Sequence, residues 1–331
     1  MRARGWSVAT LGEPGDVLEL IDSSLPDPQP GQVLLRVRAC ALNFPDVLMI
    51  RGQYQDRPPL PFTPGIEVCG DVMAAPDGPF PVGSRVIGGT LLPFGALAEY
   101  ALAETRHLHA APASLDDARA ASFTVAYQTA WMALVHRARL LPGETVLVHA
   151  AAGGVGTAAI AVAKAMGARV VGVVGGADKA SVASRFGADA VIDRLAHPTL
   201  DSLVTALKDA LGRRGADVVF DPVGGDSFTA STKVMAFEGR LVVIGFAGGA
   251  IPTLAVNHAL VKNYSVVGLL WGAYRFRAPA LVENAWAALE RLLADGMQPP
   301  AVSQVLPLDR AVDGLVELGA GRTTGRVVVQ P

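Results

Sequence analysis

The sequence contains almost no cysteine, with only Cys40 and Cys69 among 331 residues and no C-x-x-C spacing between them. This scarcity excludes a disulfide framework and a structural zinc lobe, and it favours two buried thiols in a reducing compartment. An excess of one charge is also lacking, because the net charge is −2 and the chain has no basic block or acidic tail. Neither nucleic acid nor an anionic membrane is therefore indicated as a partner.

An apolar signal segment is missing after Met1, so we expect no secretory signal and a cytoplasmic protein. One stretch, residues 145–163, carries no Asp, Glu, Lys or Arg and has roughly the length of a membrane span. Glycines cluster at its centre, however, and a strand pattern gives way there to a helix pattern. These features are typical of a buried α/β unit, and no membrane segment is predicted.

What the sequence does contain is a strand, a glycine turn and a helix in direct succession. The strand 146–148 leads into Ala152-Gly153-Gly154-Val155-Gly156, and a helix pattern follows. Small side chains let the backbone approach a dinucleotide pyrophosphate, and the first N–H groups of the helix point at it. The spacing departs from Gly-x-Gly-x-x-Gly, so the glycines alone are weak evidence. A second strand at 168–174 follows a helix of the length that a right-handed crossover needs, and we predict nucleotide binding.

Two regions with different patterns are expected, because 331 residues exceed the usual size of a single core. Up to about residue 120, short strands such as 32–39 and 82–88 alternate with proline-dense loops, as in a compact β-rich module. After a helical stretch at 115–140, Val/Ile-rich strands alternate with helices, as a doubly wound parallel sheet requires. These strands are expected at 146–148, 168–174, 191–193, 216–221, 239–245 and 265–270. A helix at 280–293 and a strand at 325–329 are expected to return to the first module.

Five motifs spread over nearly the whole chain resemble those of one family. They are Asn43-Phe-Pro-Asp46, Gly52-Gln-Tyr54, Pro64-Gly-Ile-Glu67, Asp221-Pro-Val-Gly-Gly225 and Asn257-x-x-Leu-x-Lys262. In this order they are similar to the zinc-free medium-chain dehydrogenases/reductases, and most of all to the quinone oxidoreductase (zeta-crystallin-like) branch. The resemblance implies an α/β protein with a GroES-like β-barrel catalytic domain, residues 1–121 completed by 272–331, and a Rossmann NADPH-binding domain, residues 122–271. It also implies an active site in the cleft between these domains.

The resemblance excludes catalytic zinc at the usual place. Zinc-dependent relatives have a cysteine ligand where this chain has Asn43 and a histidine where it has Ile66. Asparagine and isoleucine cannot supply the thiolate and imidazole that a catalytic Zn²⁺ needs. The six histidines are scattered, and only His107 and His109 are closely spaced; we predict that they lie in a surface loop. No metal site is therefore predicted.

The end of the second nucleotide-domain strand favours NADPH over NADH. NAD-specific sites usually place a carboxylate there to accept from the ribose 2′-hydroxyl, whereas this strand runs into Gly175 and no carboxylate occurs before Asp178. The resemblance places Lys179 and Arg194 at the 2′-phosphate, and the alternative for both is a solvated surface charge. It also implies cofactor contacts from Asn43, Thr129, Gly245, Phe246 and Arg326 together with the glycine turn.

Hydride addition to a quinone or an enone places negative charge on an oxygen, which positioned hydrogen-bond donors must stabilise. The resemblance places Asn43 and Tyr54 near the nicotinamide, and the Tyr54 hydroxyl could also deliver a proton. Tyr54 and Trp271 are expected to contact the substrate. The alternatives are a loop asparagine that binds its own backbone, a loop tyrosine packed on the barrel, and, for Thr129, an ordinary helical threonine.

Two neighbours of Asn43 qualify this prediction. We expect Asp46 to orient the local backbone rather than to titrate in catalysis. Leu48 stands where many relatives carry a tyrosine, which makes the pocket more apolar and puts the specificity for quinones in doubt.

The sequence therefore predicts an NADPH-dependent, zinc-free reductase of a quinone or an α,β-unsaturated carbonyl. Two alternatives remain open, namely a non-catalytic NADPH-binding protein, by analogy with structural crystallins, and an enoyl-thioester reductase. A homodimer is expected through the apolar edge strand 264–270, because the unpaired backbone groups of an edge strand invite a second chain. An apolar run at 261–271 supports this expectation.

Overall fold

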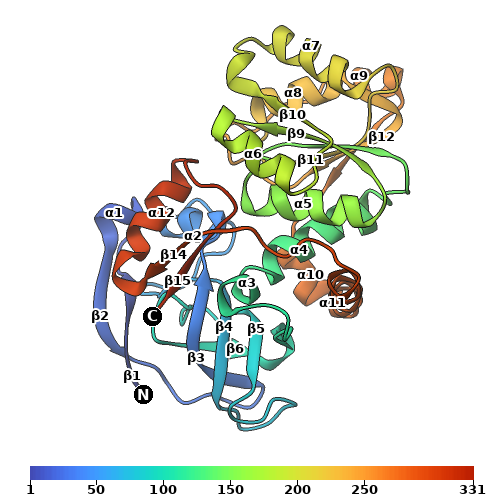
Figure 1. Ribbon diagram of the computed structural model, residues 1–331. Coiled ribbons are helices and arrows are strands. Elements are labelled where there is room, and N and C mark those ends of the chain that lie inside the picture. The colour runs from blue at the N-terminus through green and yellow to red at the C-terminus, as the bar shows by residue number, and fades with distance from the viewer. The chain divides into compact units, whose positions relative to one another are not determined.

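The computed structural model describes residues 1–331, which form two compact units (Figure 1). Unit 1 comprises Met1–Val125 and Pro300–Pro331, and unit 2 comprises Ala126–Pro299. The sequence places the two boundaries after residues 121 and 271. The second boundary lies later in the structure because helix α11 (Pro279–Ala294) packs on α10 (Trp271–Arg277) within unit 2.

Unit 1 is built on a seven-stranded sheet, in which six strands follow the order β14-β15-β3-β4-β5-β7 and β6 is the seventh, paired with β3. Its strands are β1 (Arg2–Val8), β2 (Leu18–Ser24), β3 (Gln32–Ala41), β4 (Glu67–Ala74), β5 (Arg85–Gly89), β6 (Tyr100–Glu104), β7 (Leu108–Ala110), β14 (Val302–Pro307) and β15 (Arg326–Gln330). Its short helices are α1 (Pro14–Val17), α2 (Phe44–Ile50), η1 (Thr105–His107), α3 (Asp117–Ala121), η4 (Leu308–Arg310) and α12 (Ala311–Gly319). Strands β1 and β2 form a separate hairpin.

The long strand β3 organises the β-rich unit. Strand β4 pairs along one edge of β3, and the other edge is shared by β6 at its beginning and β15 at its end. The chain's last strand therefore closes the sheet formed by its first hundred residues, as the sequence predicts. The core beneath it is aliphatic and includes Val33, Leu35 and Val329, which have no exposed surface.

Unit 2 is a six-stranded parallel sheet in the order β10-β9-β8-β11-β12-β13. Its strands are β8 (Thr145–Val148), β9 (Arg169–Val174), β10 (Ala190–Asp193), β11 (Ala216–Asp221), β12 (Met235–Val243) and β13 (Ser265–Gly268). Its helices are η2 (Met132–Arg137), α5 (Gly154–Ala165), α6 (Ala177–Arg185), η3 (Arg194–Ala196), α7 (Leu200–Leu211), α8 (Gly225–Lys233), α9 (Val256–Lys262), α10 and α11. Helix α4 (Thr124–Trp131) begins at the end of unit 1 and continues as the π-helix η2.

The sheet of unit 2 is doubly wound, as the alternating pattern predicts. Helices α5 and α6 contact each other, and α7 contacts α8, so one pair covers each face (Figure 1). Strands covered on both faces bury every side chain, which is why Val146, Leu147 and Val148 have no exposed surface. The order reverses between β8 and β11, since β8 leads through α5 to β9 and β11 leads through α8 to β12.

The edge strand is shorter than the apolar run 261–271 suggests. Strand β13 covers only Ser265–Gly268, and Val261 belongs to helix α9 instead. Asn263 ends that helix in the left-handed conformation, with a φ of 53°, and so turns the chain into the strand. The prediction of a strand at the sheet edge is confirmed, but its extent to residue 270 is wrong.

No helix of the structure combines the length and the apolar character that crossing a bilayer requires. The uncharged stretch 145–163 is divided between β8, the glycine turn and α5.

Candidate active site

The glycine turn joins β8 to α5 at the carboxyl edge of the parallel sheet in unit 2. Ala150 adopts a φ of 49°, Gly153 caps the helix, and Gly154 is its first residue. Gly156 must lack a side chain, because a Cβ there would lie 2.1 Å from the Ala150 carbonyl oxygen. The first N–H groups of a helix have no partner within it, so this twelve-residue helix offers donors to an anion at its beginning.

Two cations follow strands at the carboxyl edge of the sheet, Lys179 on α6 after β9 and Arg194 on η3 after β10. The Arg194 guanidinium lies against Gly175, since a Cβ built on that glycine would be 3.3 Å from both Nε and Nη2. Partial burial, followed by the charge of Arg194, lowers the pKa of Lys179. Asp193 accepts from the Gly176 N–H at 2.7 Å and so fixes the loop between them. An anion bound here would relieve the repulsion between the cations.

The carboxyl ends of β8 and β11, where the strand order reverses, carry a buried histidine and a buried aspartate. His149 Nε2 lies 2.7 Å from Ser231 Oγ. That hydroxyl donates to the Ser227 carbonyl at 2.8 Å, so the histidine must be the donor to Ser231. Asp221 Oδ1 accepts from two backbone N–H groups of the following turn. Open α/β sheets bind ligands outside such a switch point.

The remaining atoms of this pair, His149 Nδ1 and Asp221 Oδ2, are buried without a hydrogen-bond partner. Burial lowers the pKa of His149, the Asp221 charge opposes that effect, and the Arg194 charge adds to it. Sequence reasoning missed His149, although a histidine at the end of an apolar strand was an available signal.

The other predicted residues of unit 2 lie at separate places around this sheet edge. Gly245 and Phe246 follow β12; the Phe246 ring lies against Gly224, and a Cβ on Gly245 would be 3.6 Å from the Pro222 carbonyl oxygen. Thr129 lies on α4 and is 7% exposed. Trp271 begins α10, and its indole Nε1 donates to Gln128, the residue next to Thr129.

Unit 1 holds a buried polar cluster formed by Asn43, Glu67 and Arg326. The Arg326 guanidinium forms an ion pair with Glu67 Oε2 and donates from Nη1 to Asn43 Oδ1 at 2.9 Å. The Asn43 amide in turn donates to Glu67 Oε2 at 3.1 Å and to the Ala41 carbonyl at 3.0 Å. Burial raises the pKa of Glu67, against the opposing effect of the Arg326 charge.

These contacts bear directly on the roles expected for Asn43 and Arg326. Asn43 is 3% exposed, and its two amide hydrogens and its oxygen all have partners inside unit 1. Arg326 is 5% exposed and balances a buried carboxylate. A direct hydrogen bond from the Asn43 amide hydrogens to a ligand would require an internal contact to break, whereas the Arg326 Nε is buried without a partner. Sequence reasoning identified Glu67 as part of a motif but did not foresee its pairing with a residue at the far end of the chain.

Asp46 orients the backbone, as predicted. Its Oδ2 accepts from the Asn43 N–H at 2.8 Å, and its Oδ1 accepts from the N–H groups of Gly65 and Ile66 at 3.0 and 3.1 Å. Burial raises its pKa to about 6, against the hydrogen bonds that favour the carboxylate. One side chain thus joins the motifs that begin at Asn43 and Pro64.

Leu48 lies on helix α2, and Tyr54 follows that helix in the chain. Tyr54 is partly buried and packs against the aliphatic core of unit 1, and Leu48 is half-buried on α2.

The histidine pair is not in a surface loop, and that prediction is wrong. His107 ends the short helix η1 with Nδ1 3.1 Å from Glu104, and His109 is 8% exposed on β7. His109 lies opposite Ile87 of β5 in the sheet of unit 1. Burial, followed by the charge of His107, lowers the pKa of His109 to about 4. No group of three His, Cys, Asp or Glu side chains is arranged to hold a metal ion.

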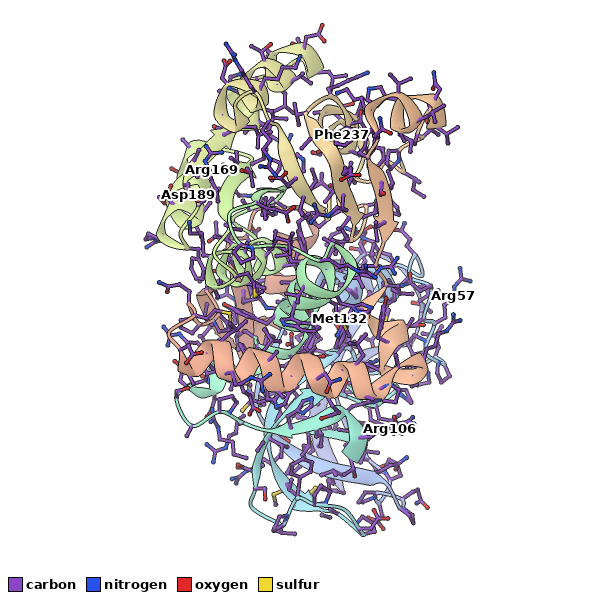
Figure 2. The ribbon with its side chains drawn as sticks, turned by 90° about the vertical axis from the view of Figure 1, so that its right-hand side faces the viewer. Arg57, Arg106, Met132, Arg169, Asp189 and Phe237 are labelled. Carbon is purple, nitrogen blue, oxygen red and sulfur yellow. The ribbon has the colours of Figure 1, made fainter.

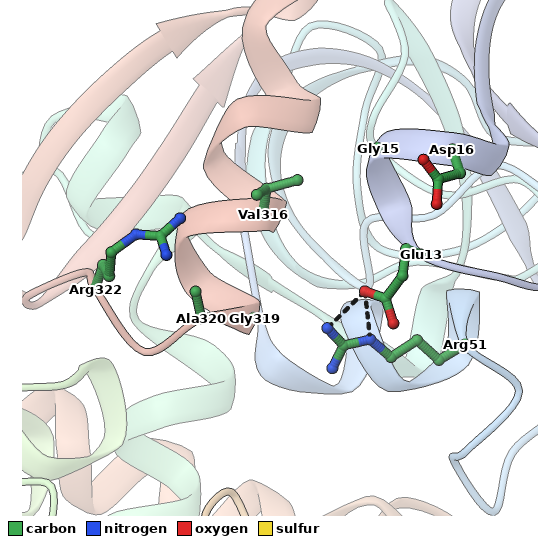
Figure 3. A pocket seen from close by; sticks show the side chains of 8 residues that line it. All are labelled: Glu13, Gly15, Asp16, Arg51, Val316, Gly319, Ala320 and Arg322. Carbon is green, nitrogen blue, oxygen red and sulfur yellow. Dashed lines mark hydrogen bonds and ion pairs between the residues drawn. The ribbon is translucent and has the colours of Figure 1, made fainter.

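A cavity of about 370 Å³ lies in unit 1 between α1, the end of α2 and α12 (Figure 3). Arg51 binds Glu13 at its rim with Nη2 2.8 Å from Oε2. Its apolar wall includes Val316 and Ala320. None of the predicted site residues lines this cavity, and it is therefore not the candidate active site.

Comparison with known proteins relates both parts of the chain to one group of enzymes. Residues 29–113 match the family described as alcohol dehydrogenase GroES-like domain, and residues 154–291 match the one described as zinc-binding dehydrogenase. The chain is 38% identical to quinone oxidoreductase-like protein 2 of Rattus norvegicus over 303 residues, which cover 91% of this chain and 85% of that protein.

Solved structures extend the similarity over the full length. A probable oxidoreductase from Mycobacterium abscessus is 34% identical with a TM-score of 0.88, and the match covers 100% of this chain and 99% of that one. The quinone oxidoreductase of Escherichia coli, solved in complex with NADPH, is 28% identical with a TM-score of 0.89, and the match covers 99% of this chain and 100% of that one.

Proposed function

Since the chain belongs to the quinone oxidoreductase family of the medium-chain dehydrogenases/reductases, we propose that it transfers hydride from NADPH to a quinone or an α,β-unsaturated carbonyl. It is an NADPH-dependent oxidoreductase with a GroES-like unit and a doubly wound nucleotide-binding unit. The observation that carries the proposal is the pairing, within unit 2, of the glycine turn with the cations Lys179 and Arg194. NADPH, when bound, supplies the hydride.

The residues that would hold NADPH fit its charges. The first turn of α5 would face the pyrophosphate, with Ala152, Gly153, Gly154, Val155 and Gly156 as its backbone contacts. Gly175, Lys179 and Arg194 would surround the 2′-phosphate, where the mutual repulsion of the two cations favours an anion. We assign further cofactor contacts to Thr129, Gly245 and Phe246.

We divide the polar residues of unit 1 into two roles. Tyr54 is proposed as the donor that stabilises the negative oxygen formed by hydride addition and that supplies its proton. Asn43 and Arg326 are proposed as positioning residues, because the Asn43 amide and the Arg326 Nη1 and Nη2 already bind Glu67 and each other. Leu48 and Trp271 would supply apolar surface for the ring of the substrate.

Zinc has no part in the proposed reaction, because Asn43 and Ile66 stand at the two ligand positions. Elemental analysis of the purified protein should find no stoichiometric zinc, and activity should survive treatment with a chelator. One zinc per chain together with loss of activity on chelation would contradict this part of the proposal.

We also propose a cytoplasmic homodimer. The two thiols are free and buried, which suits a reducing compartment. Strand β13 ends the sheet, and apolar side chains near it are exposed. They include Phe237 on β12 (Figure 2), Val266 on β13 and Leu270 beyond it. A second β13 would pair with the free edge and cover these side chains.

The decisive test is NADPH oxidation with ortho- and para-quinones, enones and enoyl thioesters as acceptors. Turnover of quinones or enones is expected. Preference for enoyl thioesters would favour an enoyl-thioester reductase, and binding of NADPH without turnover of any acceptor would indicate a non-catalytic, crystallin-like protein.

Cofactor choice is tested by binding. NADPH should bind at least tenfold more tightly than NADH, a difference of about 1.4 kcal/mol. Lys179→Ala and Arg194→Ala should each narrow that ratio, because each removes a cation from the 2′-phosphate. Lys208→Ala, which removes an exposed cation from α7, is the control and should leave the ratio unchanged. Equal dissociation constants for NADPH and NADH in the wild type would refute the assignment.

A further inference from the structure

Gln128 is a buried amide that is only half satisfied. It lies on α4 and has no exposed surface. Its Oε1 accepts from the indole Nε1 of Trp271 at 3.0 Å. Because an indole nitrogen can only donate, this contact identifies the oxygen of the amide and leaves Nε2 on the other side. Nε2 is buried and has no acceptor.

An unpaired buried donor is unfavourable by about 1–3 kcal/mol, and most buried polar atoms in proteins have partners. A methionine would fill similar space at this position without that penalty. Arrival of the partner with a ligand is one physical explanation of such an exception. A neutral amide donor suits a neutral acceptor, and a carbonyl oxygen is the acceptor that the proposed substrates share.

The surroundings of Gln128 hold its partner in place. Trp271 begins α10, which is attached to η2 by the edge contact of the His136 and Tyr274 rings, 5.8 Å apart between centroids. The Arg275 guanidinium lies 5.4 Å from the centroid of the Trp271 indole. Helix α4 also changes to a π-helix directly after Trp131, a distortion that is frequent at functional sites.

We propose that Gln128 is a specificity-determining residue whose Oε1 fixes the indole of Trp271 and whose Nε2 donates to a carbonyl oxygen of the substrate. This inference rests on the proposed function for the identity of the substrate. The amide is covered in the substrate-free protein, so neighbouring side chains must move for the carbonyl to reach it. The hydrogen bond to Trp271 fixes which way the amide faces, and the substrate ring would lie beside the indole.

The test compares two ligands of similar shape, one with carbonyl oxygens and one without. Binding of 1,4-naphthoquinone and of naphthalene is measured by equilibrium dialysis in the absence of NADPH. Gln128→Glu keeps the acceptor for Trp271 and removes the donor, and Gln128→Met removes both. Each variant should bind the quinone at least tenfold more weakly than the wild type and bind naphthalene within about twofold of it.

Trp271→Phe provides the second arm, because it leaves the amide but removes the contact that orients it. It should weaken quinone binding less than Gln128→Glu does. A cooperative thermal unfolding transition and the dissociation constant of NADPH serve as checks on folding, and the dissociation constant of NADPH should stay close to the wild-type value in the variants. If Gln128→Glu does not fold, the uncharged Gln128→Met variant carries the test.

Equal weakening for the quinone and for naphthalene would reduce Gln128 to a packing residue, and unchanged quinone binding would reject the contact. The proposed function fails separately, through a wild-type protein that oxidises NADPH with none of the acceptors. The dialysis result is independent of that outcome, because it involves no turnover.

Discussion

Asn43, Asp46, Glu67 and Arg326 show how single residues maintain a polar interior in unit 1. A buried ion pair offsets its desolvation only when its remaining atoms are also hydrogen-bonded. Here the Asn43 amide supplies a contact to each partner and backbone N–H groups supply others to the carboxylates, but the Arg326 Nε is buried without a partner. Removing any one side chain would leave its neighbours buried and unpaired.

Asp46→Asn is expected to destabilise the protein by about 1–3 kcal/mol at pH 7.5. The NH₂ group of the asparagine would face a backbone N–H group whose hydrogen bond the carboxylate accepts in the wild type, so two donors would face each other. Urea unfolding of the wild type and the variant measures the difference. Burial raises the wild-type pKa to about 6, above the ordinary value of 3.8, so the folded wild type gains stability by binding a proton as the pH falls below 6. The asparagine variant cannot bind that proton, and the difference should therefore widen. A difference independent of pH would contradict this assignment.

His109 should make the protein less stable in acid. Its folded pKa of about 4 lies below the ordinary histidine value of about 6.5, so the unfolded chain binds the proton more readily in this interval. Its contribution is therefore complete above pH 6.5 and is lost as the pH falls toward 4. In His109→Gln, the free energy of unfolding should decline less steeply over that range, and an unchanged slope would exclude His109 as a source.

At the scale of elements, the glycine turn between β8 and α5 is determined first by packing. The Ala150 carbonyl occupies the space that a side chain on Gly156 would need, whereas a Cβ on Gly153 would lie 3.3 Å from the same oxygen. The helix can therefore begin close to the strand only with glycine at position 156. That proximity also brings the first N–H groups of the helix to the edge of the sheet.

Gly156→Ala should destabilise unit 2 and weaken NADPH binding at least tenfold, because the added methyl group displaces the turn. Gly153→Ala is the matched comparison and should have a clearly smaller effect on the unfolding midpoint. Thermal unfolding and fluorescence titration with NADPH measure the two properties. Similar effects of both substitutions would show that the close approach at Ala150 is not the controlling contact.

The sequence predicts the elements of both units well, because their patterns are local. The strands of unit 2 appear as Val/Ile runs, and five of the six begin within two residues of the expected positions. The exception is β12, which begins earlier than expected, at Met235. The edge strand β13 was expected to be longer because the apolar run 261–271 was read as one strand. The beginning of that run belongs to helix α9, whose apolar side chains are exposed. An apolar run cannot distinguish a strand from the exposed surface of a short helix.

At the scale of the whole molecule, the free edge of the parallel sheet is the feature that most favours self-association. Val266 on β13 is 38% exposed, and Val256, Leu260 and Val261 on α9 are each more than 70% exposed. Apolar surface of this kind, next to unpaired strand backbone, is typical of an interface.

Light scattering at micromolar concentration should therefore give about twice the chain mass of 34.3 kDa. Val266→Lys should produce the monomer, because it places a charge in the apolar surface beside the pairing edge. Val82→Lys, at a 69% exposed site in unit 1, is the control and should remain a dimer. A wild-type monomer would reject the association, and a dimer that persists in Val266→Lys would place the interface elsewhere.

The sequence by itself determined the two-unit organisation, the parallel α/β sheet, the glycine turn and the absence of a carboxylate before Asp178, because each depends on neighbouring residues. Only the tertiary structure decided what the polar side chains bind. Arg326 reaches Asn43 across 283 positions, and Trp271 reaches Gln128 across 143. A side chain's hydrogen bonds depend on which residues the fold brings within about 3 Å, and no local pattern carries that information.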